Sequence, residues 1–226
     1  MPANVEKYVQ IASQLKPDSV ELVVVSKIQS KEDILIMYNL GHRDFGENYV
    51  QELVEKQAAL PSDIRWHFIG HLQRNKVKYI APFVHLIHGV DSLELLKEIN
   101  KQAKKNDRII SCLLQIHIAQ EETKFGMNEE ELALAIQALT DETGTLSNVF
   151  VQGLMGMASF SDDAQKVRNE MKQLKQLFNK YTAIQSPKCR FTILSMGMSG
   201  DYEMAIEEGS NMVRIGSLLF GARPKK

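Results

Sequence analysis

The side chain with the most versatile chemistry in this sequence is an amine at the end of an apolar run. Residues 20–25 read Val-Glu-Leu-Val-Val-Val, and the run then stops on Ser26 and Lys27. Such a run is typical of a strand buried on both faces of a parallel sheet. Because ligands of α/β folds bind beyond the carboxyl ends of these strands, we expect Lys27 at the mouth of a site. A partly desolvated amine there can form a Schiff base with an aldehyde, whereas a solvated lysine that merely ends the strand is the alternative.

Two loops late in the sequence have the residue types of a phosphate site. Residues 195–200 read Ser-Met-Gly-Met-Ser-Gly, and residues 214–217 read Arg-Ile-Gly-Ser. In (β/α)8 barrels, the loops after strands seven and eight commonly bind phosphate through backbone N–H groups, and glycine lets the backbone approach the anion. The alternative is ordinary turn chemistry, in which glycine and serine are frequent anyway. The position of both loops favours the phosphate site, although the sequence has no Walker motif.

Arg214 interrupts an apolar strand, which reads Met-Val-Arg-Ile over residues 212–215. In a barrel, its side chain can point to the inside, where it needs an acceptor. Glu47, Asp201 or a ring nitrogen of a ligand could accept, and a purely structural ion pair is an equal alternative.

Several other polar or polarisable residues fall near predicted strand ends. We expect the histidines to be core residues rather than catalysts, and the spacing of His67 and His71 does not make a metal site without further ligands. The methionines near strands six and seven pack in the core by default, but they could wall an aromatic ligand. These residues are Asn48, His67, His71, Gln115, His117, Met155, Met157, Met196 and Met198.

The composition is that of an ordinary globular protein. The chain has 226 residues, of which 44% are hydrophobic, and its 27 basic and 28 acidic residues give a net charge of -1. No bulk field therefore attracts nucleic acid or a membrane, and the basic turn at residues 73–78 is best read as a solvated helix start. Cys112 and Cys189 have no disulfide or metal-ligand spacing. The sequence shows no signal peptide and no membrane-length apolar run, so we expect a cytoplasmic location.

The order of elements predicts the fold class. Eight strands alternate with helices, and a further helix over residues 3–15 precedes them; this is the pattern of a (β/α)8 TIM barrel, with an open doubly wound sheet as the runner-up. We expect Ser161 to cap the longest helix, which ends near Tyr181. No linker or repeat divides residues 1–226, so a single domain is expected. The predicted strands cover residues 20–27, 43–46, 65–70, 84–90, 109–118, 149–157, 191–196 and 212–216.

Taken together, these motifs resemble those of the pyridoxal phosphate homeostasis protein family. The resemblance spans nearly the whole chain and is most specific in the two loops around Ser195 and Arg214. The segments that carry it are residues 25–27, 45–52, 66–76, 153–157, 194–201, 212–217 and 220–223.

The resemblance implies a barrel of the alanine racemase type with pyridoxal 5'-phosphate held as an aldimine on Lys27. It implies that Ser195, Gly216 and Ser217 hold the phosphate, with Met198 or Ser199 nearby. It places Arg214 near the pyridine nitrogen, and Asn48 and Met155 close to the ring. A like charge lowers the pKa of that nitrogen, which weakens the electron sink that most such enzymes use.

The expected role is therefore a carrier that buffers and delivers the cofactor, in place of an enzyme. A racemase needs a second base, usually a tyrosine of a partner subunit's extra domain, and we expect no such domain here; Tyr49 and Tyr202 are the substitutes within the sequence. A racemase or another Schiff-base lyase is the alternative. Apo forms of pyridoxal phosphate enzymes are possible partners, and a monomer is expected. His117 and Asn211 depart from the family pattern, which leaves their roles open.

Overall fold

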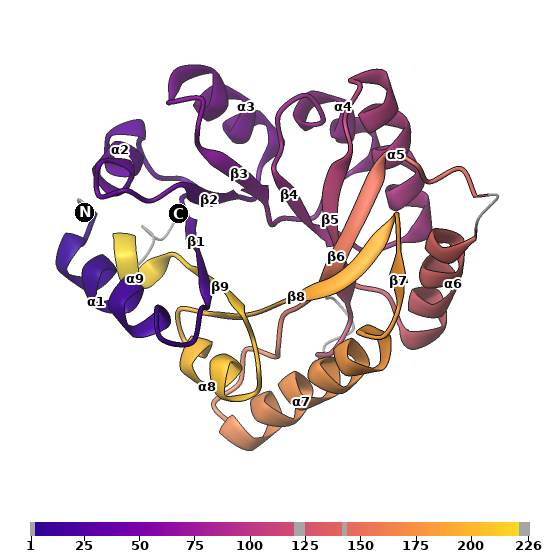
Figure 1. The fold of residues 1–226 in the computed structure, drawn as a ribbon. Coiled ribbons are helices and arrows are strands. Elements are labelled where there is room, and N and C mark those ends of the chain that lie inside the picture. The colour runs from indigo at the N-terminus through magenta and orange to yellow at the C-terminus, as the bar shows by residue number, and fades with distance from the viewer. Residues whose placement is uncertain (1–2, 120–124, 142–143, 222–226) are drawn as a thin grey trace.

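The strands of the computed structural model close into a barrel, which is described for residues 3–119, 125–141 and 144–221 (Figure 1). Eight of them are parallel: β1 (Glu21–Val25), β2 (Asp44–Glu47), β3 (Arg65–Phe68), β4 (Leu86–Val90), β5 (Ile110–Ile116), β6 (Val149–Gly156), β8 (Cys189–Met198) and β9 (Met212–Ile215). Their sheet order runs from β6 down to β1 and then through β9 to β8, and the pairing of β6 with β8 closes the ring. The predicted (β/α)8 barrel is confirmed.

Helices surround the barrel, as Figure 1 shows. They are α1 (Val5–Leu15), α2 (Lys31–Asn39), α3 (Val50–Ala59), α4 (Val77–Ile80) after a short 3-10 turn η1 (Arg74–Lys76), α5 (Leu93–Lys105), α6 (Glu129–Thr140), α7 (Ala164–Tyr181), α8 (Tyr202–Glu207) and α9 (Ser217–Phe220). The predicted additional helix, α1, lies against α9, where the N–H of Asn4 donates to the carbonyl of Leu219 at 2.7 Å. No helix in the described part of the chain combines the length and the apolar character that crossing a membrane requires.

The helices form where apolar spacing and capping residues agree. In α5, Leu95, Leu96, Ile99 and Ala103 make a buried stripe at helical spacing. Asn128 caps α6, because its side chain accepts from the N–H of Glu131.

Two details differ from the sequence prediction. Asp163 caps α7 in place of Ser161, because its carboxylate accepts from the N–H groups of both Gln165 and Lys166, while the Ser161 hydroxyl accepts only from the N–H of Asp163. A short strand, β7 (Gln185–Ser186), pairs antiparallel with the start of β8, which therefore begins at Cys189. The hairpin extends β8 two residues before its predicted start.

The core has two layers. A large cluster of apolar residues fills the space between strands and helices, and a small one inside the barrel consists of Val23, Leu86, Leu113, Met155 and Met212. Each fully buried aliphatic side chain contributes about 1.5–3 kcal/mol to stability. Buried polar residues, among them His67, His88, Ser195 and Arg214, complete the barrel interior and are joined by hydrogen bonds.

Candidate functional site

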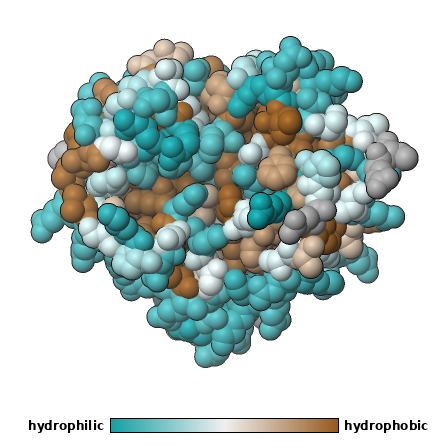
Figure 2. All heavy atoms as spheres, viewed as in Figure 1, coloured by the Kyte–Doolittle hydropathy of each residue, from teal (hydrophilic) through white to brown (hydrophobic). Residues whose placement is uncertain are grey.

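A cavity of about 500 Å³ opens among the loops that follow the carboxyl ends of the strands. Its walls come from the ends of β1, β2, β3, β6, β8 and β9, which is the edge at which the fold positions ligands. Figure 2 shows the molecule from the side of Figure 1, with apolar residues toward the middle of this face and hydrophilic ones over α7. The structure brings most of the predicted cofactor residues to this cavity: Lys27, Asn48, Met198, Ser199, Arg214, Gly216 and Ser217.

Lys27 enters the cavity from a tight turn after β1. The next residue, Ile28, has a φ of 68°, which is uncommon for a β-branched residue and costs about 1–3 kcal/mol. The turn is held because the Ile28 N–H donates to the Glu52 carboxylate at 2.6 Å and the Gln29 N–H donates to the Ser26 carbonyl at 3.0 Å. The backbone on both sides of Lys27 is therefore fixed.

A buried ion-pair cluster behind this turn was missed by the sequence reasoning. The ammonium of Lys56 donates to the carbonyl of Ser26 at 2.7 Å, to Glu47 at 2.8 Å and to Glu52 at 2.6 Å. The Ser26 hydroxyl also donates to Glu47, at 2.6 Å. Burial raises the pKa of Glu47, and the positive charge of Lys56 opposes that rise. The i, i+4 spacing of Glu52 and Lys56 is the signal in the sequence that could have indicated part of this cluster.

Arg214 points into the barrel, as predicted. It is the register partner of the interior residue Val23 and is 4% exposed. Its guanidinium donates to the Ser195 hydroxyl at 2.6 Å and to the Gly156 carbonyl at 3.0 Å. Burial lowers the pKa of Arg214 to about 10, opposed by the charge of Asp201, so the side chain is protonated at neutral pH.

These contacts correct the prediction that the carboxylate of Glu47 or Asp201 accepts a hydrogen bond from Arg214. Glu47 is bound to Lys56 and Ser26 instead. Asp201 acts on Arg214 through its charge, while its own carboxylate accepts from the Met198 N–H at 2.6 Å and so fixes the loop after β8.

Ser195 and Met155 lie in the barrel interior and do not line the cavity. Ser195 is fully buried, and its hydroxyl accepts from Arg214. Met155 is 1% exposed and packs in the interior cluster. Direct contact of these two residues with the cofactor stays a prediction, whereas the contact between Ser195 and Arg214 makes Ser195 a support of the cavity wall.

The two predicted phosphate loops meet at one wall of the cavity. The Gly216 N–H donates to the Ser199 hydroxyl at 3.2 Å, which joins the loop after β8 to the loop after β9. A Cβ at Gly216 would lie 3.1 Å from the Cβ of Val25 and 3.2 Å from its carbonyl oxygen, so glycine allows this close approach. Ser217 begins α9, and the first N–H groups of a helix have no acceptor within it. Ser199, Gly216 and Ser217 thus lie together at one wall of the cavity.

Asn48 has an unsatisfied group at the cavity. Its side chain lines the cavity, and Oδ1 is buried without a hydrogen-bond partner in the described structure. A buried acceptor of this kind costs about 1–3 kcal/mol unless a ligand donor satisfies it. An amine, small residues with hydroxyl and N–H groups, a guanidinium and an orphaned amide oxygen fit a ligand that carries an aldehyde, a phosphate and a hydroxyl on a ring.

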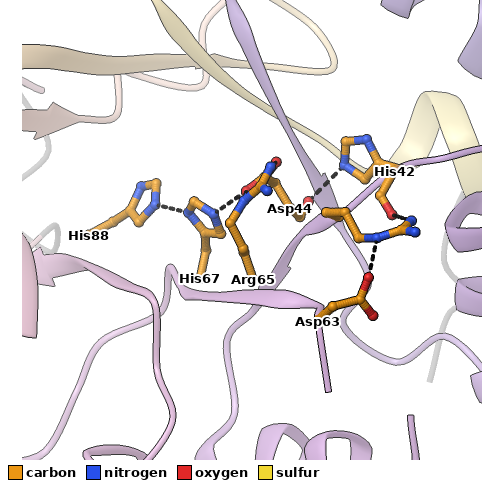
Figure 3. A network of polar contacts seen from close by, with 7 residues as sticks. His42, Asp44, Asp63, Arg65, His67 and His88 are labelled. Carbon is orange, nitrogen blue, oxygen red and sulfur yellow. Dashed lines mark hydrogen bonds and ion pairs between the residues drawn. The ribbon is translucent and has the colours of Figure 1, made fainter. Parts of the chain in front are cut away.

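His67 is a core residue, as predicted, whereas His71 lies at the surface. His67 is buried, and its ring nitrogens contact His88 at 2.9 Å and Asp44 at 3.1 Å (Figure 3). His71 lies elsewhere, because it is bound to Asp91 at 3.0 Å and stacks on Phe125. The pair His67 and His71 therefore does not form a site.

A possible ligand set for a metal lies at the opposite end of the barrel. Ligand atoms of Asp44, His67 and His85 lie within 4.8 Å of one another. However, Arg65 binds both carboxylate oxygens of Asp44, one of them through Nε at 2.6 Å. The carboxylate already has a cationic partner, so we assign Asp44 to Arg65.

The two departures from the family pattern lie away from the cavity. His117 lines a separate hollow with Glu129 and Lys180. Asn211 joins β8 to the start of β9, since its side chain accepts from the Leu194 N–H at 2.8 Å and donates to the Thr192 carbonyl at 2.7 Å. Asn211 is thus a structural link.

Comparison with known proteins agrees with this geometry. Residues 2–224 match the family described as alanine racemase, N-terminal domain. An alanine racemase from Bartonella henselae superposes with a TM-score of 0.71 at 16% identity, covering 97% of this chain and 60% of that one, which shows the shared fold. The fold and the site thus define a lysine-bearing barrel of the alanine racemase class.

Relatives with higher identity narrow this class. A pyridoxal phosphate homeostasis protein from Aquifex aeolicus is 42% identical over 90% of this chain and 87% of its own, and one from Synechocystis is 38% identical over 96% and 97%. PipY from Synechococcus elongatus has been solved without and with pyridoxal phosphate; both structures are 34% identical, cover 96% of this chain and 99% of their own, and have TM-scores of 0.88 and 0.85. The chain belongs to the pyridoxal phosphate homeostasis protein family.

Proposed function

We propose that this protein binds pyridoxal 5'-phosphate on Lys27 and buffers and delivers it without catalytic turnover. The observation that carries the proposal is the convergence of Lys27, Arg214 and the link between Ser199 and Gly216 on one cavity. A relative of 34% identity has been solved with this cofactor bound.

Each part of the cavity suits one part of the cofactor. When bound, the cofactor would supply an aldehyde carbon for a Schiff base with the Lys27 amine, and the carbonyl oxygen would leave as water. Ser199, Gly216 and Ser217 would hold the phosphate through hydroxyl and N–H donors. Arg214 would face the ring nitrogen, and the orphaned Oδ1 of Asn48 would accept from the ring hydroxyl.

The residues around the cavity support a carrier function over an enzymatic one. A charged Arg214 beside the ring nitrogen would keep that nitrogen unprotonated and so limit stabilisation of a carbanion. A racemase or Schiff-base lyase, the alternative function, also needs a second base. Tyr49 is 56% exposed and lines a different hollow, and the Tyr202 hydroxyl is bound to Gln14 and Glu203. Neither tyrosine that could substitute for that base lines the cavity.

Delivery of the cofactor requires a surface that the receiving protein can cover. We propose that the receiving proteins are apo forms of pyridoxal phosphate enzymes. We also propose that the carrier is a monomer. Phe160 and Met198 line the cavity and are 100% and 37% exposed. Two large apolar side chains at one opening support contact with another protein, since such contact would shield the aldehyde from water.

Two assays separate a carrier from an enzyme. The loaded protein is mixed with an apo-enzyme, and the recovery of that enzyme's activity is followed over time. In parallel, the loaded protein is incubated with L-alanine in D2O, and exchange at the α-carbon is followed by NMR. We expect cofactor transfer without exchange, and transfer that requires Lys27 when Lys27→Ala is tested. Multiple-turnover exchange, or a failure to transfer, would contradict the carrier function.

A further inference from the structure

A continuous line of hydrogen bonds crosses the barrel interior from its amino-terminal end to the cavity. Asp44 contacts His67 at 3.1 Å, His67 contacts His88 at 2.9 Å, and His88 contacts the Ser195 hydroxyl at 3.3 Å. Ser195 in turn contacts Arg214 at 2.6 Å. We call these five residues the interior network; Figure 3 shows its Asp44, His67 and His88 end.

The two ends of the interior network fix the direction in which its hydrogen bonds are donated. A guanidinium can only donate, so Arg214 donates to the Ser195 oxygen. Asp44 is ionised: burial opposes its charge, but hydrogen bonds from His67 and Arg65 outweigh that effect and hold the pKa of the carboxyl well below its usual range. An ionised carboxylate can only accept, so His67 donates to it through Nε2.

If the rings of His67 and His88 are uncharged, their ring protons have only one possible arrangement. A neutral His67 that donates through Nε2 accepts at Nδ1, and His88 must therefore donate to it through Nε2. The Nδ1 atom of His88 is left as an acceptor for the Ser195 O–H. Burial lowers the pKa of His88 well below its usual value, opposing protonation, which agrees with a neutral ring. The Nε2–H of each histidine and the Ser195 O–H then each have an acceptor.

We propose that His88 and His67 are positioning residues for Arg214, acting through the Ser195 hydroxyl. Without an acceptor at His88, that hydroxyl could rotate and turn its hydrogen toward the guanidinium. With His88 in place, a lone pair of Ser195 faces Arg214. The second acceptor of Arg214 is the Gly156 carbonyl, so a neutral pair of acceptors holds the guanidinium, and its charge stays directed to the cavity.

The inference on positioning rests on the proposed cofactor site, but the tautomers can be read without cofactor. Nitrogen-15 NMR of the histidine rings at pH 8 in the cofactor-free protein distinguishes a protonated from an unprotonated ring nitrogen. We expect the proton that each of these two rings shares within the interior network to lie on Nε2, with His67→Asn and His88→Leu used to assign their signals. A His88 ring protonated at Nδ1 would overturn the proposal, since it would donate to Ser195.

Cofactor binding tests the positioning itself. Ser195→Ala removes the acceptor of Arg214, and we expect the affinity for pyridoxal phosphate to fall on the order of tenfold to a hundredfold, with a shifted absorbance maximum. His88→Leu, which leaves Ser195 in place, should shift the spectrum in the same direction by less, and Ser195→Thr should restore the wild-type spectrum.

Leu113→Ala is the matched control, because it opens a cavity in the same barrel interior without changing a residue of the interior network. A wild-type spectrum and affinity in Ser195→Ala or His88→Leu, or the same changes in Leu113→Ala, would overturn the positioning role. If the wild-type protein takes up no cofactor at all, the proposed function fails, and the tautomers still decide whether the interior network has the inferred direction.

Discussion

Lys56 and Glu47 form an ion pair of 2.8 Å behind the turn that presents Lys27, and their side chains are 5% and 0% exposed. The same ammonium binds the carbonyl of Ser26, the residue before Lys27. A buried pair of this kind adds little net stability by itself, but the loss of one partner leaves an uncompensated charge in the interior. The position of Lys27 therefore depends on a charge cluster that does not line the cavity.

Removal of Lys56 should affect both the fold and the site. Lys56→Met leaves Glu47 buried without its cation, so we expect a loss of about 3–5 kcal/mol in the free energy of unfolding and weaker cofactor binding. Urea denaturation and a binding titration measure the two effects. The double variant Lys56→Met, Glu47→Gln should recover much of the stability, and a single variant as stable as the wild type would refute the role of this pair.

The close approach at Gly216 gives a second prediction. In Gly216→Ala, the new methyl group lies 3.1 Å from the Val25 side chain, so β1 or the phosphate loop must shift. We expect a cost of about 1–3 kcal/mol in stability and an affinity about tenfold lower. Gly200→Ala is the control for stability, because no atom lies within 4 Å of its added carbon. Equal stability of the two variants would show that the contact at Gly216 is not limiting.

The low pKa of Asp44 makes its contribution to stability dependent on pH. The pKa is about 3.9 in an unfolded chain and lower in the folded protein, so the ionised carboxylate stabilises the fold above that value and its contribution is lost as the pH falls toward the folded pKa. Asp44→Asn should therefore lose about 1.5–3 kcal/mol at pH 7 and less at pH 3, measured by urea denaturation. Asp63→Asn, which alters an exposed ion pair with Arg43, should change stability by less than about 1 kcal/mol. A deficit in Asp44→Asn that is the same at both pH values would contradict this account.

The two cysteines should be unreactive in the folded protein. Cys112 and Cys189 are fully buried, and burial raises the pKa of the Cys112 thiol, which disfavours the reactive thiolate. A thiol-reactive dye should label neither residue until urea unfolds the protein. Rapid labelling of the native protein at either cysteine would show that these strands open.

The sequence was sufficient for the fold class and for the loops of the site. Alternating apolar runs and helical spacing are local signals, and the interruption of an apolar strand by Arg214 indicated an inward-pointing guanidinium. Small differences between the predicted and observed helix ends, such as the cap at Asp163, arise because several polar residues compete for the same N–H groups.

The partners of buried charges could not be predicted in the same way. Glu47 was a candidate acceptor for Arg214, yet Lys56 reaches it from α3. His67 and His88 lie 21 residues apart on neighbouring strands, and their contact depends on strand register and side-chain rotamers. Neither property has a signature in the spacing of residues along the chain.

Absorbance spectra of the wild type and Lys27→Ala with pyridoxal phosphate, followed by borohydride reduction and peptide mass analysis, test the central claim most directly. We predict a visible absorbance band in the wild type, a stable mass addition on the peptide that contains Lys27, and neither in the variant. A band and a mass addition that persist in Lys27→Ala would place the cofactor on another lysine and contradict the site described for this cavity.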